Sequence, residues 1–164
     1  MFVLGIDGGG THTRLELRDM ENRLLRREEF GPFNLNSIGE DGFRQLLRQV
    51  FDDCGGMQEC ARLCVGGAGV SNPRVHEVLA QELEATGFTG TWKLCGDQEI
   101  ALRGAMDTPG LILIAGTGSI CFGKNGAGET FRSGGYGHLI DDGGSGYALG
   151  RDVLSQAVRE ADGR

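Results

Sequence analysis

Two glycine-rich turns, each at the end of an apolar run, contain the residue types that bind phosphate. The turns consist of Asp7, Gly8, Gly9, Gly10 and Thr11 in the first, and of Gly116, Thr117 and Gly118 in the second. Glycine has no Cβ, so main-chain N–H groups in such turns can approach a bulky anion, and a hydroxyl at the end of each turn adds a donor. The Asp7 carboxylate is suited to hold a divalent cation through its water shell. Facing each other, the two turns would bind a nucleotide's phosphates from both sides.

Each turn has a simpler interpretation that the residues argue against. A two-residue hairpin connection needs one glycine or an Asn-Gly pair, and the first turn exceeds that requirement. The segment after Gly118 nearly spells a Walker A loop, but Asn125 stands where serine or threonine is required. Cys121 occupies the place of the third glycine in a dinucleotide-binding fingerprint. We therefore interpret both turns as phosphate-binding turns of another kind.

Asp97 is the candidate for proton transfer. It lies between a strand predicted at residues 91–95 and a helix predicted at residues 98–106. Its carboxylate could cap that helix, a role that aspartate performs well. Alternatively it could face a cleft, orient a sugar or alcohol hydroxyl and accept its proton during phosphoryl transfer. The position of Asp97 between the two phosphate turns favours the second role.

A long glycine-rich loop, residues 133–150, runs into the last predicted helix and carries paired carboxylates that include Asp142. Capping by Asp142 or Ser145 explains the start of that helix. Capping does not explain the aromatic–glycine steps at Tyr136 and Tyr147, which suit a surface that packs on a sugar ring.

Alternating strands and helices must position these residues. Strands are predicted at residues 2–6, 12–18, 23–30, 61–65 and 91–95, and helices after residue 37, after residue 72 and at residues 98–106. This order predicts a complete mixed α/β domain with an antiparallel meander on one side and right-handed crossovers on the other. The pattern then restarts, with strands at residues 111–114, 119–122 and 129–132 and a helix at residues 145–161. The predicted domains are therefore a first lobe, residues 1–108, and the beginning of a second, incomplete lobe, residues 109–164.

Local signals predict where the first two helices begin. Ser37 and Glu40 have the spacing of a capping box, in which each side chain bonds the other residue's main-chain N–H. Asn72 is the predicted cap of the second helix, with Pro73 in its first turn.

Composition and charge exclude several classes of partner. The chain has 164 residues, of which 30 are glycines clustered at strand ends, and a net charge of -7, which argues against a nucleic-acid-binding surface. No apolar run approaches the ~20 residues that cross a bilayer, and the first residues lack the basic region of a signal peptide. We expect no nucleic-acid partner, no membrane partner and a cytoplasmic location.

The five cysteines do not have metal-site spacing. Cys54, Cys60 and Cys64 form no C-x-x-C pair, which disfavours a metal or iron–sulfur site. Cys64, Cys95 and Cys121 lie in apolar strand contexts, where we expect reduced thiols within the core.

Taken together, five ordered motifs resemble those of the N-acetylglucosamine kinases, which belong to the BadF/BadG/BcrA/BcrD ATPase family of the actin/hexokinase superfamily. The motifs are Gly5-x-Asp7-Gly8-Gly9-Gly10-Thr11, Gly31-Pro32-x-Asn34, Gly96-Asp97, Ile114-Ala115-Gly116-Thr117-Gly118-Ser119 and Gly135-Tyr136-Gly137-x-x-x-x-Asp142-x-Gly144-Ser145-Gly146. They extend over nearly the whole chain, and their order makes the match specific where any one motif would be weak.

The resemblance implies two ribonuclease H-like lobes that bind ATP, Mg²⁺ and an amino sugar, N-acetylglucosamine or glucosamine. The γ-phosphoryl group would pass to the sugar 6-hydroxyl, with Asp97 as the base and Thr11 and Thr117 on the phosphates. The sugar-binding positions would be Asn34, Ser119, Ile120, Gly135, Tyr136, Gly137 and Asp142. In this family an acidic residue is usual where this chain has Gly143, a departure that bears on sugar identity.

Family members are also longer, with adenosine-contacting segments beyond residue 164. The chain therefore resembles an N-terminal portion of such a kinase, and we expect this portion alone to lack efficient turnover. The incomplete second lobe would leave one edge of its sheet unpaired, and a second copy of the chain could pair with that edge; we therefore predict a possible homodimer. Two other functions stay in view: an ATPase activator of the same family, and a non-catalytic sugar-binding sensor.

Overall fold

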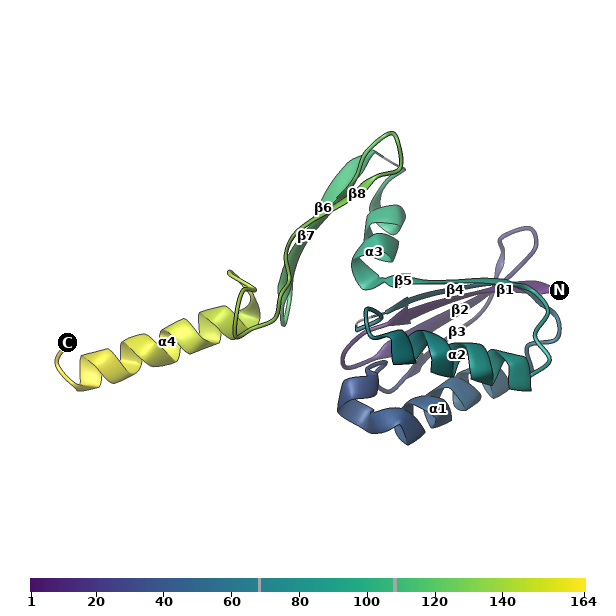
Figure 1. Ribbon diagram of the computed structural model, residues 1–164, viewed down its shortest axis with the longest axis horizontal. Helices are drawn as coiled ribbons and strands as arrows, with labels where there is room; N and C mark the ends of the chain where they lie inside the picture. The colour runs from purple at the N-terminus through teal and green to yellow at the C-terminus, as the bar shows by residue number, and fades with distance from the viewer. Residues whose placement is uncertain (68, 108) are drawn as a thin grey trace. The chain divides into compact units, whose positions relative to one another are not determined.

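A computed structural model describes residues 1–67, 69–107 and 109–164 (Figure 1). The chain forms two compact units, Met1–Ile100 and Ala101–Arg164. Thr108, the last residue of the predicted first lobe, lies outside the described residues. No described helix has both the length and the apolar character needed to cross a membrane.

The first unit contains a five-stranded mixed sheet in the order β3-β2-β1-β4-β5. Its strands are β1 (Phe2–Gly8), β2 (Thr13–Asp19), β3 (Leu24–Phe30), β4 (Cys60–Gly67) and β5 (Thr91–Gly96). Strands β1, β2 and β3 pair antiparallel, whereas β4 runs parallel to both β1 and β5. This arrangement confirms the predicted mixed sheet with its meander.

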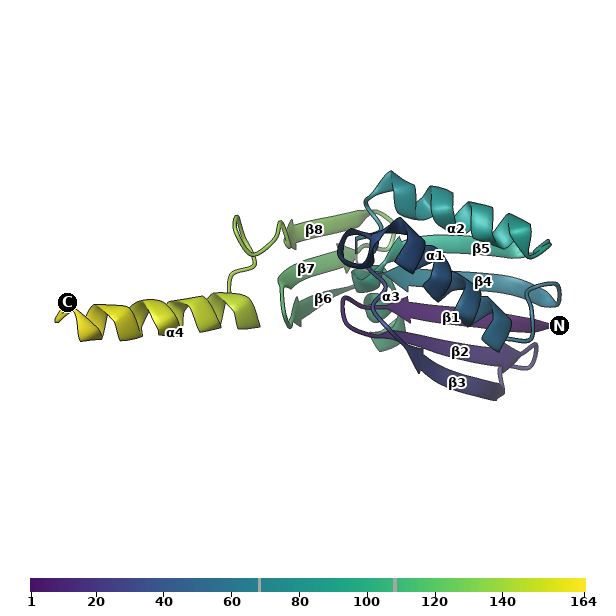
Figure 2. The same ribbon diagram turned by 90° about the horizontal axis from the view of Figure 1, so that it is seen from below.

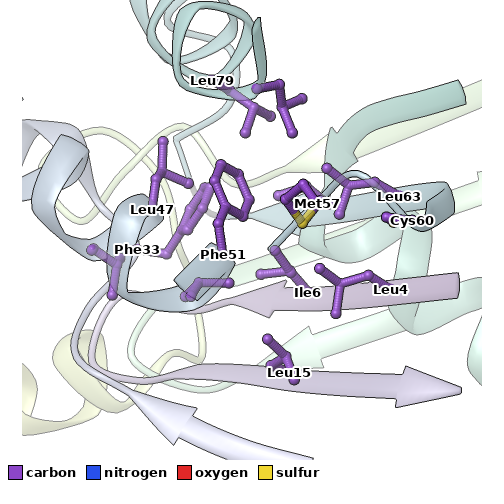
Figure 3. Packing of buried hydrophobic residues seen from close by; sticks show 14 of the residues in the cluster. Leu4, Ile6, Leu15, Phe33, Leu47, Phe51, Met57, Cys60, Leu63 and Leu79 are labelled. Atoms are coloured by element: carbon purple, nitrogen blue, oxygen red, sulfur yellow. The ribbon is translucent and has the colours of Figure 1, made fainter. Parts of the chain in front are cut away.

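Helices α1 (Leu35–Asp53) and α2 (Pro73–Ala85) cover one face of this sheet (Figure 1, Figure 2). Apolar residues alternate along β1, so that Leu4 and Ile6 point into the core with Phe51 of α1 and Leu79 of α2 (Figure 3). The intervening residues of β1, Asp7 among them, lie on the opposite face, called here the open face. Helix α3 (Asp97–Ala105) follows β5 and spans the boundary between the units.

Helix α1 begins earlier than predicted, and the proposed capping box is wrong. Asn34 is the N-cap, with its side chain accepting a hydrogen bond from the N–H of Asn36 at 3.0 Å. The main-chain N–H of Ser37 is already bonded to the Asn34 carbonyl, and the Glu40 carboxylate binds arginines. Gly39, with φ of 72°, interrupts the helical backbone just after this first turn. By contrast, Asn72 caps α2 as predicted.

Charged residues join α1 to α2. Glu82 of α2 is buried and accepts hydrogen bonds from Arg44 and Arg48 of α1, each at 2.8 Å. Glu40 of α1 accepts bonds from Arg44 and from Arg74 of α2. The bonds from Arg48 and Arg44 outweigh burial and hold the pKa of Glu82 below its ordinary value. Arg74 and Arg44 lower the pKa of Glu40 to about 2.

The second unit restarts the strand pattern, as predicted. It contains an antiparallel sheet in the order β6-β7-β8 and one long helix. The elements are β6 (Gly110–Ala115), β7 (Ser119–Lys124), β8 (Thr130–Gly134) and α4 (Gly146–Ala161). Ser145, one of the two predicted caps, is the N-cap of α4 and accepts a hydrogen bond from the N–H of Ala148 at 3.1 Å.

Candidate functional site

The carboxyl ends of three parallel strands form one edge of the first sheet. Asp7 of β1 pairs with Gly66 of β4, and Gly67 of β4 pairs with Gly96 of β5. Asp97 follows β5 directly, so it lies at the same edge as Asp7, two strands away. Since neighbouring strands are about 4.8 Å apart, the ends of β1 and β5 are separated by roughly 10 Å.

The first glycine turn lies at this edge. The N–H of Gly9 donates to the His12 carbonyl at 2.8 Å and closes the turn. Thr11 is exposed, and its hydroxyl lies 2.9 Å from the His12 ring. Asp7 is also exposed, and no described residue forms a hydrogen bond or ion pair with its carboxylate. The space around the Gly10 Cα is open: beyond its chain neighbours, no described residue has an atom within 4 Å of the place a Cβ would occupy.

Phe33 supports this turn, a role that the sequence analysis did not assign. Its N–H donates to the Gly9 carbonyl at 2.9 Å, and its ring is buried. A Cβ on Gly8 would lie 2.6 Å from Cδ1 of that ring, and one on Gly67 would lie 2.7 Å from Cε1. The ring therefore lies directly against the ends of β1 and β4. The sequence does contain a signal for this role: Phe33 is the x of Gly31-Pro32-x-Asn34, and an apolar side chain inside a polar turn needs a place to pack.

Asn34 follows Phe33 and is held at the same edge. Its side-chain oxygen is engaged in capping α1, which leaves the amide group to donate to a ligand. The buried hydroxyl of Thr13 donates to the Gly31 carbonyl at 2.7 Å and ties the loop to the start of β2. Thr13 is a second positioning residue that the motifs did not reveal.

Asp97 is the first residue of α3 and is partly buried. Its Oδ1 accepts the N–H of Gln98, the next residue, at 3.0 Å. A capping carboxylate instead accepts from the second or third N–H of the helix. The start of α3 is anchored through Ile100, which packs where Gly66 has no side chain: a Cβ there would lie 2.6 Å from Cγ1 of Ile100. The Asp97 carboxylate is thus not engaged as an ordinary cap.

The second glycine turn and the long loop are in direct contact within the second unit. The Gly146 N–H donates to the Gly116 carbonyl at 2.8 Å, and the Ser119 hydroxyl donates to the Gly143 carbonyl at 2.9 Å. A Cβ on Gly118 would lie 2.9 Å from Oδ2 of Asp142. Predicted phosphate-binding and sugar-binding residues therefore share one cluster. Thr117 is exposed in the same turn.

Asp142 has an unusual conformation for its position. It is only 8% exposed and has φ of 63°, a left-handed backbone value that aspartate adopts more readily than most other non-glycine residues. Its carbonyl accepts the N–H of Ser145 at 3.1 Å, just before α4.

Tyr136 presents an aromatic surface near this cluster. It is 63% exposed, and the Arg132 guanidinium lies 4.5 Å from its ring centroid. Gly135 and Gly137 flank it with φ of 76° and 94°, which explains why both are glycines. A Cβ on Gly135 would lie 3.0 Å from Ile120, so these two predicted sugar-binding residues are in contact.

The predicted site residues thus form two clusters. Residues of the first turn, Asn34 and Asp97 belong to Met1–Ile100, and the remaining predicted residues belong to Ala101–Arg164. That the two glycine turns face each other stays a prediction.

The fold and these clusters define an α/β protein of the actin/hexokinase type. The chain belongs to the BadF/BadG/BcrA/BcrD ATPase family, whose model matches residues 4–164. It is 34% identical to the N-acetylmuramic acid/N-acetylglucosamine kinase of Clostridium acetobutylicum, over 99% of this chain and 55% of that protein. It is 31% identical to the N-acetyl-D-glucosamine kinase of Dictyostelium discoideum, over 97% of this chain and 54% of that protein.

One solved structure is similar to this chain over almost its whole length. The crystal structure of a candidate N-acetylglucosamine kinase from Chromobacterium violaceum matches with a TM-score of 0.82 and 28% identity, covering 99% of this chain and 59% of that one. The chain spans about half the length of the curated relatives it matches.

Proposed function

We propose that the chain contributes the phosphate-binding, proton-accepting and sugar-binding residues of an ATP-dependent amino-sugar kinase. The observation that carries this proposal is the placement of Asp97 at the same sheet edge as Asp7 and the first glycine turn. The relatives, which are kinases of N-acetylated amino sugars, support the same class of substrate. Because the chain spans about half of those relatives, the activity is proposed for the full-length protein.

The first turn suits the phosphates and their cation. The exposed Asp7 carboxylate has no partner among the described residues, which fits a role in holding hydrated Mg²⁺. Bound Mg²⁺ would neutralise charge on the phosphates. The open space at Gly10 allows a phosphate to approach the main chain, and the Thr11 hydroxyl adds a donor. Gly116, Thr117 and Gly118 have the corresponding role in the second unit.

Asp97 would act as the general base. Its carboxylate accepts the proton of the sugar 6-hydroxyl as that oxygen attacks the γ-phosphorus. A new oxygen–phosphorus bond forms, the bond to the β-phosphate oxygen breaks, and ADP leaves. The roughly 10 Å between the ends of β1 and β5 leaves room for the phosphoryl group between Asp7 and Asp97.

The sugar is assigned to polar and aromatic groups of both clusters. The Asn34 amide can donate to a sugar hydroxyl, and the Asp142 carboxylate can accept from one. The exposed Tyr136 ring offers a face for the sugar ring. The other residues of this set are Ser119, Ile120, Gly135 and Gly137.

The test is an assay of the full-length protein with ATP, Mg²⁺ and a panel of sugars: N-acetylglucosamine, N-acetylmuramic acid, glucosamine and glucose. We expect ADP release that depends on an amino sugar, with the phosphate on the 6-oxygen by phosphorus NMR. ATP hydrolysis that no sugar stimulates would instead favour an ATPase activator. Sugar binding without ADP release would favour a sensor.

A further inference from the structure

Two cysteines share the open face of the first sheet. Cys64 of β4 pairs with Lys93 of β5, and Cys95 of β5 pairs with Gly66 of β4, so the two cysteines are diagonal neighbours on adjacent strands. Cys95 is buried, but Cys64 is exposed, which corrects the expectation of a core thiol. The alternation of β4 sends Leu63 and Val65 to the core and leaves Cys64 on the other face.

Cys64 lies where small molecules can reach it. The open face has a groove of about 580 Å³ whose lining includes Cys64, Lys93 and Arg62. Lys93 is paired with Glu99 at 2.5 Å, which holds an ammonium group near the thiol. A peroxide or another small electrophile can therefore approach Cys64 from this groove.

The surroundings of Cys64 favour its reactive form. The neighbouring Cys95 side chain and the charge of Lys93 lower the pKa of Cys64, against burial and the charge of Glu99, which raise it. Cys95, whose thiol donates to the Val65 carbonyl at 3.7 Å, has a raised pKa. Burial raises the pKa of Cys54 to about 12 and that of Cys60 to about 11. Because the thiolate is the nucleophile, Cys64 is more reactive than those buried cysteines.

We propose that Cys64 is a site of reversible oxidation by hydroperoxides, and that Cys95 resolves the oxidised form into a Cys64–Cys95 disulfide. The Cys64 thiolate attacks one peroxide oxygen, a sulfur–oxygen bond forms, and the oxygen–oxygen bond breaks to release hydroxide or an alkoxide, which takes a proton from water. The Cys95 sulfur then attacks the sulfenic sulfur. The sulfur–sulfur bond forms, and the departing hydroxide combines with the Cys95 proton as water. The two sulfurs together lose the two electrons that reduce the peroxide.

The bond would strain the sheet. Parallel strands lie about 4.8 Å apart and rise about 3.3 Å per residue, so the Cα atoms of these diagonal neighbours are about 8 Å apart, whereas a disulfide needs about 4.4–6.8 Å. Its formation therefore draws the ends of β4 and β5 together, and a strained disulfide is easily reduced again. Asp97 is two residues beyond Cys95, so the bond also displaces the proposed base. This last consequence rests on the proposed function, whereas the thiol chemistry does not.

The experiment treats the chain with hydrogen peroxide, blocks free thiols by alkylation and maps the cysteines by mass spectrometry. We expect a Cys64–Cys95 cross-link that dithiothreitol reverses. In Cys95→Ser the sulfenic acid should persist on Cys64 and react with dimedone. In Cys64→Ser neither the cross-link nor dimedone labelling should appear. Without peroxide, iodoacetamide at neutral pH should modify Cys64 at least about tenfold faster than Cys54 or Cys60.

Several outcomes would overturn the proposal. These are a cross-link that joins other cysteines, dimedone labelling of Cys121 ahead of Cys64, or equal alkylation rates for Cys64 and Cys60. Cys121→Ser is the matched control and should leave the cross-link unchanged. In the full-length protein, a reversible cross-link without any change in turnover would retain the thiol site and remove only its link to Asp97.

Discussion

The Phe33 ring lies so close to Gly8 that a Cβ on Gly8 would be 2.6 Å from its Cδ1 atom. Real Cβ atoms are not found at that separation, so the side chain of any other residue at position 8 would displace the ring. Phe33 also packs edge-on against Phe43 of α1, with ring centroids 4.8 Å apart. The first glycine turn is thus joined to the core through one buried aromatic side chain.

Gly8→Ala should destabilise the chain by about 1–3 kcal/mol, the usual cost of overpacking a core. Gly10→Ala is the matched control, because no atom of another described residue, chain neighbours aside, lies within 4 Å of its Cβ position and its backbone is not left-handed. Thermal unfolding should show a lower Tm for the first variant alone. In the full-length protein, Gly10→Ala should raise the KM for ATP. Equal Tm values for the two variants would contradict the role given to Phe33.

Asp97→Asn should lower kcat by about 10²–10⁴, because the amide cannot accept the proton of the sugar hydroxyl. Sugar binding, measured by calorimetry, should persist, because the amide can still hydrogen-bond that hydroxyl. Glu99→Gln, in the same turn of α3, is the control and should keep kcat within about twofold. Near-normal phosphorylation by Asp97→Asn would reduce Asp97 to a structural residue.

Asp7→Asn should raise the Mg²⁺ concentration needed for half-maximal activity and weaken MgATP binding, because the variant lacks the charge that holds the hydrated cation. Thr11→Val should weaken MgATP binding without changing the Mg²⁺ requirement. Sugar affinity should stay unchanged in both. Asp41→Asn, an exposed substitution on α1, controls for net charge. Calorimetry that finds sugar affinity lost and nucleotide affinity retained would show that the roles are misassigned.

Gly118→Ala should raise the KM for the sugar, because its Cβ would press on the Asp142 carboxylate at 2.9 Å. In the described part of the chain, the Cβ of Gly116→Ala would meet no atom within 4 Å beyond its chain neighbours, so this variant should raise the KM for ATP only. Initial-rate kinetics with each substrate varied in turn separates the two effects. An unchanged sugar KM in Gly118→Ala would remove Asp142 from the sugar site.

Glu82→Gln should destabilise the chain at neutral pH by roughly 1.5–3 kcal/mol, because Arg44 and Arg48 lose a charged acceptor. The folded-state pKa of Glu82 lies below its ordinary value of 4.5. Its stabilisation is therefore complete above about pH 4.5 and is lost as the pH falls through the lowered pKa. Urea unfolding across this range should show the two chains converging in acid, with Glu84→Gln as the exposed control. A difference that persists undiminished at the lowest pH would contradict the assignment.

Several local predictions held because they depend on neighbours in the sequence. Asn72 and Ser145 cap their helices, and the apolar spacing of Phe43, Leu47 and Val50 identified the buried side of α1. The Ser37 cap failed for a reason that spacing does not contain. Gly39 takes a left-handed conformation and separates one short turn, capped by Asn34, from the rest of the helix.

Taken alone, the sequence determined the order of strands and helices, the two glycine turns and the family resemblance, because periodicity and motifs are local properties of a chain. Strand register is not local, and only the tertiary structure decided it. That register brought Asp97 to the edge that carries Asp7, and placed Cys64 beside Cys95 on an exposed face. It also set Phe33 against Gly8 and Gly67, because their contact depends on how the loop after β3 crosses the ends of β1 and β4.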